Sequence, residues 1–108
     1  MVGTTRAPAR EDVATRLALL KAVADPTRLQ VLEQLEMVGS RCHCELEETL
    51  GVPANRMSFH LRVLRDVGLV VTERQGKRVA YRLDDTGLAR LRRALPGMGG
   101  APGGEAGS

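Results

Sequence analysis

Residues 51–68 read GVPANRMSFHLRVLRDVG, and this stretch decides the fold. On a helical wheel at 100° per residue, its core candidates fall within about 60° of one another; they are Met57, Leu61 and Leu64. A shorter segment with two leucines at helical spacing comes before it and ends at Gly51. Two short amphipathic helices joined by a glycine-containing turn are typical of a helix-turn-helix. We therefore expect the second helix of such a motif over residues 54–67.

The opposite side of this helix carries an amide, a hydroxyl, guanidinium groups and one aromatic ring. An amide pairs with adenine, a guanidinium with guanine or phosphate, and an apolar ring can contact the thymine methyl group. For the phenylalanine, filling a gap in the core is the structural alternative. We predict contacts to double-stranded DNA by Asn55, Arg56, Ser58, Phe59 and Arg62.

After Gly68 the apolar pattern changes to alternation, which predicts strands over residues 69–74 and 79–83. Gly76 lies in the turn between them, where a positive φ is needed. Basic side chains surround this turn, so it resembles a wing that lies along phosphates or enters a minor groove. A solubilising loop is the alternative. The candidate DNA contacts are Arg74, Lys77 and Arg78, with Arg82 nearby.

Three further amphipathic helices are expected around this unit. The first carries Val13, Leu17, Leu20 and Ala24, the second begins at Pro26 and carries Leu29, Leu32 and Leu35, and the last follows Asp84-Asp85 and carries Leu88, Leu91 and Leu95. The expected fold is mainly α with a small β-hairpin, a winged helix-turn-helix in the order α-α-α-α-β-β-α. Residues 10–95 form the domain, residues 1–9 a flexible arm, and residues 96–108 a flexible tail rich in Gly, Pro and Ala.

Composition narrows the function. With 108 residues and 43% apolar side chains, the chain suits one domain. Residues 11–50 carry four basic and eight acidic side chains, whereas residues 51–82 carry seven basic and two acidic ones, a charge separation that favours a polyanion partner. One Phe, one Tyr and no Trp argue against a stacking platform for single-stranded RNA. No phosphate loop or oriented nucleophile is visible, so we expect no enzyme.

No apolar run approaches the roughly 20 residues that span a bilayer, and no signal-peptide pattern opens the chain. The two cysteines lie one residue apart and make no disulfide framework. We therefore expect a protein of the reducing cytoplasm, with both thiols free and no membrane partner.

Three stretches resemble the ArsR/SmtB family of winged-helix, metal-responsive repressors: LKAVADPTRLQVL at 20–32, SFHLRVLRDVGLV at 58–70 and RQGKRVAYRL at 74–83. The resemblance covers roughly residues 11–95. It implies a homodimer built by the first and last helices, with Leu17, Leu20, Leu88 and Leu91 at the seam. The resemblance also implies that the dimer binds a palindromic operator and that binding of a ligand weakens its affinity for DNA. His60 is expected to pack or to contact phosphate.

The sequence RCHCE at residues 41–45 opens the third helix, where a helix N-terminus stabilises thiolates. The family's Cys-x-Cys metal site matches Cys42 and Cys44. Its arsenic-sensing version has a third cysteine where this chain has Glu47, so Ni, Zn or Co is expected rather than arsenite. His43 and Glu47 are possible additional ligands, as are Glu11 and Asp12 of a second subunit.

A second family metal site, on the last helix, is not matched. Asp85 is present there, but Gly87, Met98 and Ala101 stand at its other positions. Alternatives for the same fold are a regulator switched by thiol oxidation or by a protein co-regulator. A winged-helix module that binds proteins instead of DNA is a further class, which the basic wing disfavours.

Overall fold

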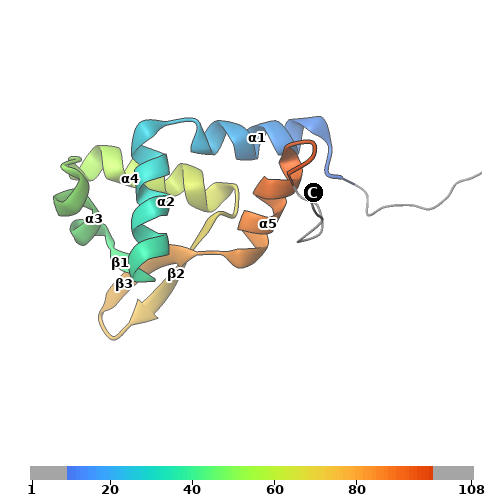
Figure 1. Cartoon of the computed structure of the whole chain (residues 1–108). Coiled ribbons are helices and arrows are strands. Elements are labelled where there is room, and N and C mark those ends of the chain that lie inside the picture. The colour runs from blue at the N-terminus through green and yellow to red at the C-terminus, as the bar shows by residue number, and fades with distance from the viewer. Residues whose placement is uncertain (1–9, 99–108) are drawn as a thin grey trace, which may run out of the picture.

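The computed structural model describes residues 10–98, which form five helices and a small sheet (Figure 1). The elements are α1 (Val13–Val23), α2 (Pro26–Val38), β1 (Arg41–Cys42), α3 (His43–Leu50), α4 (Ala54–Asp66), β2 (Val70–Gln75), β3 (Arg78–Leu83) and α5 (Asp85–Ala94). The expected order is confirmed, with β1 as an addition. The flexible arm expected at residues 1–9 and most of the expected tail lie outside the described residues.

Side-chain caps and glycines set the helix boundaries. The carboxylate of Asp12 accepts a hydrogen bond from the Thr15 backbone N–H at 2.8 Å, and this caps α1. Asp25 caps α2 in the same way, with Pro26 in the first turn. At the start of the turn between α3 and α4, Gly51 ends α3 with φ of 66°, a conformation that favours glycine.

The sheet is antiparallel throughout and has the order β1-β3-β2. The hairpin pairs run from Val70 with Leu83 to Gln75 with Arg78. β1 adds Cys42 opposite Ala80. A two-residue strand is too short to show alternation in a sequence, which is why it was not expected. Its pairing joins the wing to the start of α3.

The core lies between the helices and the inner face of the sheet. It consists of Leu19, Ala22, Val31, Leu32, Leu35, Leu46, Met57, Leu61, Leu64, Leu69 and Val70. The expected stripes of the first two helices were partly wrong. Val13, Leu17 and Leu29 are exposed, while Leu19 and Ala22 are the buried residues of α1. Because α1 has apolar residues on more than one side, periodicity alone does not show which side is packed.

α1 and α5 lie side by side, far from α3 (Figure 1). Arg90 donates to both carboxylate oxygens of Glu11, at 2.5 and 2.8 Å. At Gly87, a Cβ atom would stand only 1.8 Å from the carbonyl oxygen of Gly68. Glycine is therefore required for the close approach of α5 to the loop before β2. Among residues 10–98, no helix is long and apolar enough to cross a membrane.

Candidate DNA interface and thiol site

The outer face of α4 is open to solvent. Met57, Leu61 and Leu64 point into the core and are fully buried. The five predicted DNA contacts on this helix are all exposed: Asn55, Arg56, Ser58, Phe59 and Arg62. Phe59 is 59% exposed, and its ring lies in a T-shaped arrangement with the His60 ring at a centroid distance of 5.4 Å. Phe59 therefore does not fill a gap in the core.

The hairpin projects beside α3 as a basic wing (Figure 1). Arg74, Lys77 and Arg78 are exposed on it, and Gly76 forms the turn with φ of 66°. Arg82 pairs with Glu73 on the facing strand at 2.7 Å. The wing and α4 thus present cations and hydrogen-bonding groups on neighbouring segments of the chain.

A side chain of α2, Arg28, contacts the ring of His60 on α4. Nη1 of Arg28 lies 3.0 Å from Nδ1 of His60, and Nε of Arg28 donates to the Ala22 carbonyl at 2.7 Å. Because a guanidinium can only donate, Nδ1 is the acceptor and the ring is neutral. Burial lowers the pKa of His60 below its ordinary value, although the Asp25 carboxylate opposes this. His60 therefore packs, as the first of its two expected roles requires.

The two thiols converge at the start of α3. Cys42 is the N-cap residue and is buried, Cys44 is exposed, and their Sγ atoms are 3.3 Å apart. The carboxylate of Glu45 accepts from the Cys42 backbone N–H at 2.9 Å. The Glu45 backbone N–H in turn faces the Cys42 side chain, which gives a capping box with cysteine in the usual place of serine.

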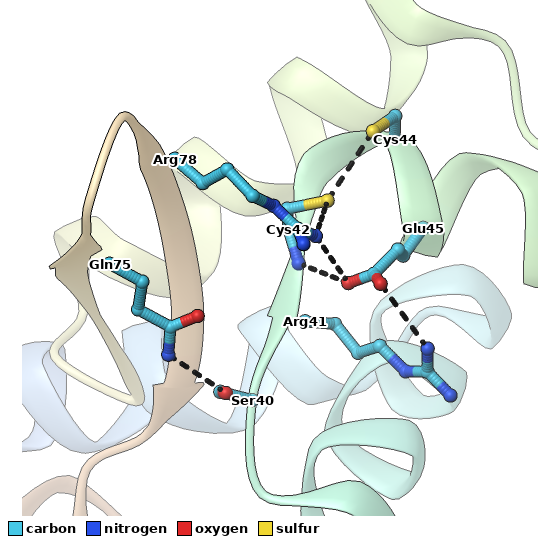
Figure 2. Close-up of polar contacts among 7 residues, drawn as sticks. All are labelled: Ser40, Arg41, Cys42, Cys44, Glu45, Gln75 and Arg78. Carbon is cyan, nitrogen blue, oxygen red and sulfur yellow. Dashed lines mark hydrogen bonds and ion pairs between the residues drawn. The ribbon is translucent and has the colours of Figure 1, made fainter.

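A guanidinium from the wing completes this cluster (Figure 2). Nη2 of Arg78 lies 2.8 Å from Cys42 Sγ and 3.1 Å from Oε1 of Glu45. Arg41 approaches the other Glu45 oxygen at 3.7 Å. The thiol pair is therefore surrounded by two cations and one carboxylate, contributed by α3, β1 and β3.

The surroundings shift the pKa values of the two thiols in opposite directions. Burial raises the pKa of Cys42, but the Glu45 backbone N–H and the Arg78 guanidinium outweigh it, so that the pKa lies below its ordinary value. The hydrogen bond and the charge of Cys42 raise the pKa of Cys44. The pair therefore favours a thiolate at Cys42 that accepts a hydrogen bond from the Cys44 thiol.

The other candidate ligands are engaged elsewhere. Nδ1 of His43 bonds Glu47, and its Nε2 lies 3.0 Å from Oγ of Ser58 on α4. Within residues 10–98, no three His, Cys, Asp or Glu side chains are grouped so that they could hold a metal ion. The sulfur pair fits two positions of a thiophilic ion, since tetrahedral Zn–S bonds of about 2.3 Å need the sulfurs only about 0.5 Å further apart. His43 and Glu47 as additional ligands remain a prediction.

Glu11 and Asp12, the candidates from a second subunit, bond Arg90 and cap α1 in this chain. Gly87, where the second family site needs a ligand, has no room for a side chain. Sequence reasoning missed two links: Arg78 with Cys42, and His43 with Ser58. The spacing of Cys42 and Glu45 is that of a capping box and predicts that residue 42 is an N-cap, but no local pattern predicts that Arg78 reaches it.

The exposed α4 face, the preceding α3 and the basic hairpin define a winged helix-turn-helix protein. Residues 25–72 match the family described as bacterial regulatory protein, arsR family. The chain is 41% identical over 86 residues to the HTH-type transcriptional regulator NmtR of Mycobacterium tuberculosis, covering 79% of this chain and 71% of that protein. This chain belongs to the arsR family of bacterial regulatory proteins. Such membership agrees with the expectation of a non-enzymatic function.

Two further likenesses extend this result. The chain is 40% identical over 84 residues to the HTH-type transcriptional repressor SmtB of Mycobacterium tuberculosis; this spans 78% of the chain but only 62% of SmtB. A solved structure described as a possible transcriptional regulator for arsenical resistance superposes with a TM-score of 0.64 at 36% identity. The superposition covers 69% of this chain and 77% of that one.

Proposed function

We propose that this protein is a transcriptional repressor that binds double-stranded operator DNA through α4 and the wing. The observation that carries the proposal is the outer face of α4, where an amide, a hydroxyl, two guanidinium groups and the ring of Phe59 stand uncovered beside a basic hairpin. Helices of this kind enter the major groove, while a wing contacts the backbone or the minor groove. The similarity to a protein named as a repressor supports the direction of regulation.

The proposed DNA-binding form is a homodimer. One helix-turn-helix reads a half-site, and two copies about 34 Å apart read a palindrome. α1 and α5 supply the seam, because Val13 and Leu17 remain exposed on α1 and Leu95 remains exposed directly after α5. A hollow of about 380 Å³ beside α1, lined in part by Ala14 and Ala18, is also open to a second chain. A protein co-regulator is not part of this proposal.

The proposed effector is a transition-metal ion bound by Cys42 and Cys44, with Ni, Zn or Co favoured over arsenite. Two adjacent sulfurs, one of them disposed to be a thiolate, support a thiophilic ion. Where a third sulfur would stand, Glu47 instead bonds His43. Ligands from outside this cluster would have to complete the coordination sphere. Bound metal supplies cross-links between the sulfurs and those ligands.

The experiment is a gel shift with labelled DNA from upstream of the protein's own gene, titrated with Ni²⁺, Zn²⁺, Co²⁺ and arsenite under reducing conditions. We expect salt-dependent binding that the cognate ion weakens. Cys42→Ser/Cys44→Ser should bind the same DNA but lose the response to the ion. If the double variant still releases DNA on addition of the ion, the effector site is elsewhere. If the wild type binds no DNA with salt dependence, the DNA-binding proposal is wrong.

One observation favours a second candidate, a switch by thiol oxidation. The Sγ atoms are already 3.3 Å apart, and a thiolate at Cys42 is the attacking species in disulfide formation. The Cys42 thiolate would attack one oxygen of hydrogen peroxide to form a sulfenic acid and release the other oxygen as water. The Cys44 thiol would then displace the sulfenic oxygen as a second water and form the S–S bond. Release of DNA by hydrogen peroxide, reversed by dithiothreitol in the presence of a chelator, would support this candidate over the metal.

A further inference from the structure

Arg78 belongs to two sites at once. It is the first residue of β3, directly after the turn of the wing, and it was predicted from the sequence as a phosphate contact. Figure 2 shows that its guanidinium turns back toward α3, where Nη2 reaches Cys42 Sγ at 2.8 Å and Glu45 Oε1 at 3.1 Å. No other cation of the wing within the described residues bonds the thiol pair.

We propose that Arg78 is the positioning residue through which the state of the Cys42–Cys44 pair controls the wing. The inference rests on the proposed function, since it names the link between the effector site and the DNA interface. In the free protein, the sulfur of Cys42 and the carboxylate of Glu45 together hold Arg78, and thereby hold the adjacent turn with Lys77. Arg78 acts as a strut between the turn and α3.

The rest of the wing is fixed independently of this strut. Cys42 pairs with Ala80 through the backbone, so that the middle of β3 stays with β1. Near the turn, the side-chain amide of Gln75 also donates an exposed hydrogen bond to Ser40, which directly precedes β1, at 3.3 Å. Control by Arg78 is therefore expected at the turn and at Lys77, and not along the whole hairpin.

An ion bound to the thiol pair weakens one of the two contacts that hold Arg78. An ion bound to Cys42 Sγ draws negative charge from the sulfur and occupies one of its lone pairs, which makes the sulfur a weaker acceptor for the Arg78 guanidinium. Arg78 would then depend mainly on Glu45, and both of these side chains are substantially exposed, at 57% and 36%. Surface ion pairs of this kind are weak. The strut opens, and the turn loses its fixed position relative to α4.

The first test needs no DNA. The chain has no tryptophan, so Lys77→Trp places a single tryptophan on the turn, which can be excited at wavelengths where Tyr81 does not absorb. Zn²⁺ is the probe, because its closed shell does not quench fluorescence or oxidise thiols; Cd²⁺ serves as a second closed-shell probe. Binding is measured separately, by competition with a chromogenic chelator. We expect Zn²⁺ to lower the fluorescence anisotropy of Lys77→Trp.

Two double variants make this result specific. In Lys77→Trp/Arg78→Ala, the anisotropy should already be low and should not change when Zn²⁺ binds. Lys77→Trp/Arg82→Ala is the matched control, because Arg82 pairs with Glu73 within the hairpin and is not bonded to the thiols. It should respond as Lys77→Trp does. Bound Zn²⁺ without any change of anisotropy in Lys77→Trp would overturn the strut, as would an equal change in Arg78→Ala.

The second test measures the coupling between ion and DNA. For the wild type, the ratio of operator affinities without and with the ion should lie within about 5- to 150-fold. Arg78→Ala should bring this ratio toward 1 while still binding Zn²⁺, whereas Arg82→Ala should keep the wild-type ratio. A ratio in Arg78→Ala equal to that of the wild type refutes the inference alone. A wild type that binds none of Zn²⁺, Cd²⁺, Ni²⁺ and Co²⁺ refutes the metal-responsive function and the inference together.

Discussion

Nε2 of His43 lies 3.0 Å from Oγ of Ser58, so that the residue between the two cysteines contacts the exposed face of α4. Glu47 holds the other nitrogen of the same ring. Ser58 is therefore oriented by α3, and the position of α3 is set at its start by Cys42 and Glu45. The thiol site has a contact with α4 in addition to its contact with the wing.

This contact predicts the effect of two substitutions on base preference. Ser58→Ala should relax the preference at one base pair, at a cost of about 1–3 kcal/mol for the favoured base. His43→Phe keeps a ring but frees Ser58, and should weaken the same preference by a smaller amount. Operator fragments with single base-pair changes measure both effects. A uniform loss of affinity over all fragments would show instead that Ser58 contacts the backbone.

The cations of the wing should govern the salt dependence of DNA binding. Removing Arg74 or Lys77 by substitution with alanine should lower the log–log salt slope by about 0.9 for each lost phosphate contact. Lys21→Ala is the control, since Lys21 lies on α1, away from the wing. Fluorescence titrations at several salt concentrations provide the slopes. An unchanged slope in Arg74→Ala/Lys77→Ala would exclude the wing from the interface.

His60 predicts a loss of stability as the pH falls below neutrality. Burial lowers its pKa in the folded chain, so the unfolded chain takes up this proton first, near pH 6.5. Stability is therefore full above that pH and falls as the pH drops through it toward the folded value, by at most about 1.4 kcal/mol per pH unit. Urea unfolding between pH 7.5 and 5.5 measures this slope.

His60→Asn is the matched variant, because its amide oxygen can still accept from Arg28 but does not titrate. Its unfolding free energy should change less over the same interval than that of the wild type. The lowered pKa of Asp25 contributes at more acidic pH and leaves this window free. Equal slopes for the two proteins would remove His60 as the cause.

The exposed side of α1 should carry the dimer. Leu17→Glu should give a folded monomer, because Leu17 is 45% exposed and its replacement leaves the core intact. Met37→Glu, at a more exposed apolar residue of α2, should leave the dimer unchanged. Light scattering at micromolar concentration, with circular dichroism as the folding control, separates the two. A Leu17→Glu protein that stays dimeric would place the seam on another surface.

Gly87 should tolerate no side chain. A Cβ at this position meets the Gly68 carbonyl at 1.8 Å, so Gly87→Ala must shift α5 and should cost about 3 kcal/mol or more. Thr86→Ala, on the exposed side of the same helix, should be nearly neutral. Thermal unfolding measures both. A small effect of Gly87→Ala would mean that α5 can move away from the loop at little cost.

Local patterns could predict much of this fold. Helix α4 was visible because Met57, Leu61 and Leu64 repeat at helical spacing, and the hairpin because Gly76 separates two alternating runs. Contacts between distant residues could not be read in this way. The bond between Arg78 and Cys42 spans 36 positions, and the buried face of α1 depends on where α4 and α5 lie.

Cys42 belongs to both the sheet and α3, because it pairs with β3 as part of β1 and is also the N-cap residue of α3. If the hairpin separates from β1, the cap and the first turn of α3 lose their support in the same event. The wing and the thiol site should therefore open as one cooperative unit, with a common free energy of local unfolding. In hydrogen exchange, the amides of the first turn of α3 and those of β3 near Ala80 would then share one protection level, and any effector that stabilises one segment would slow exchange in the other.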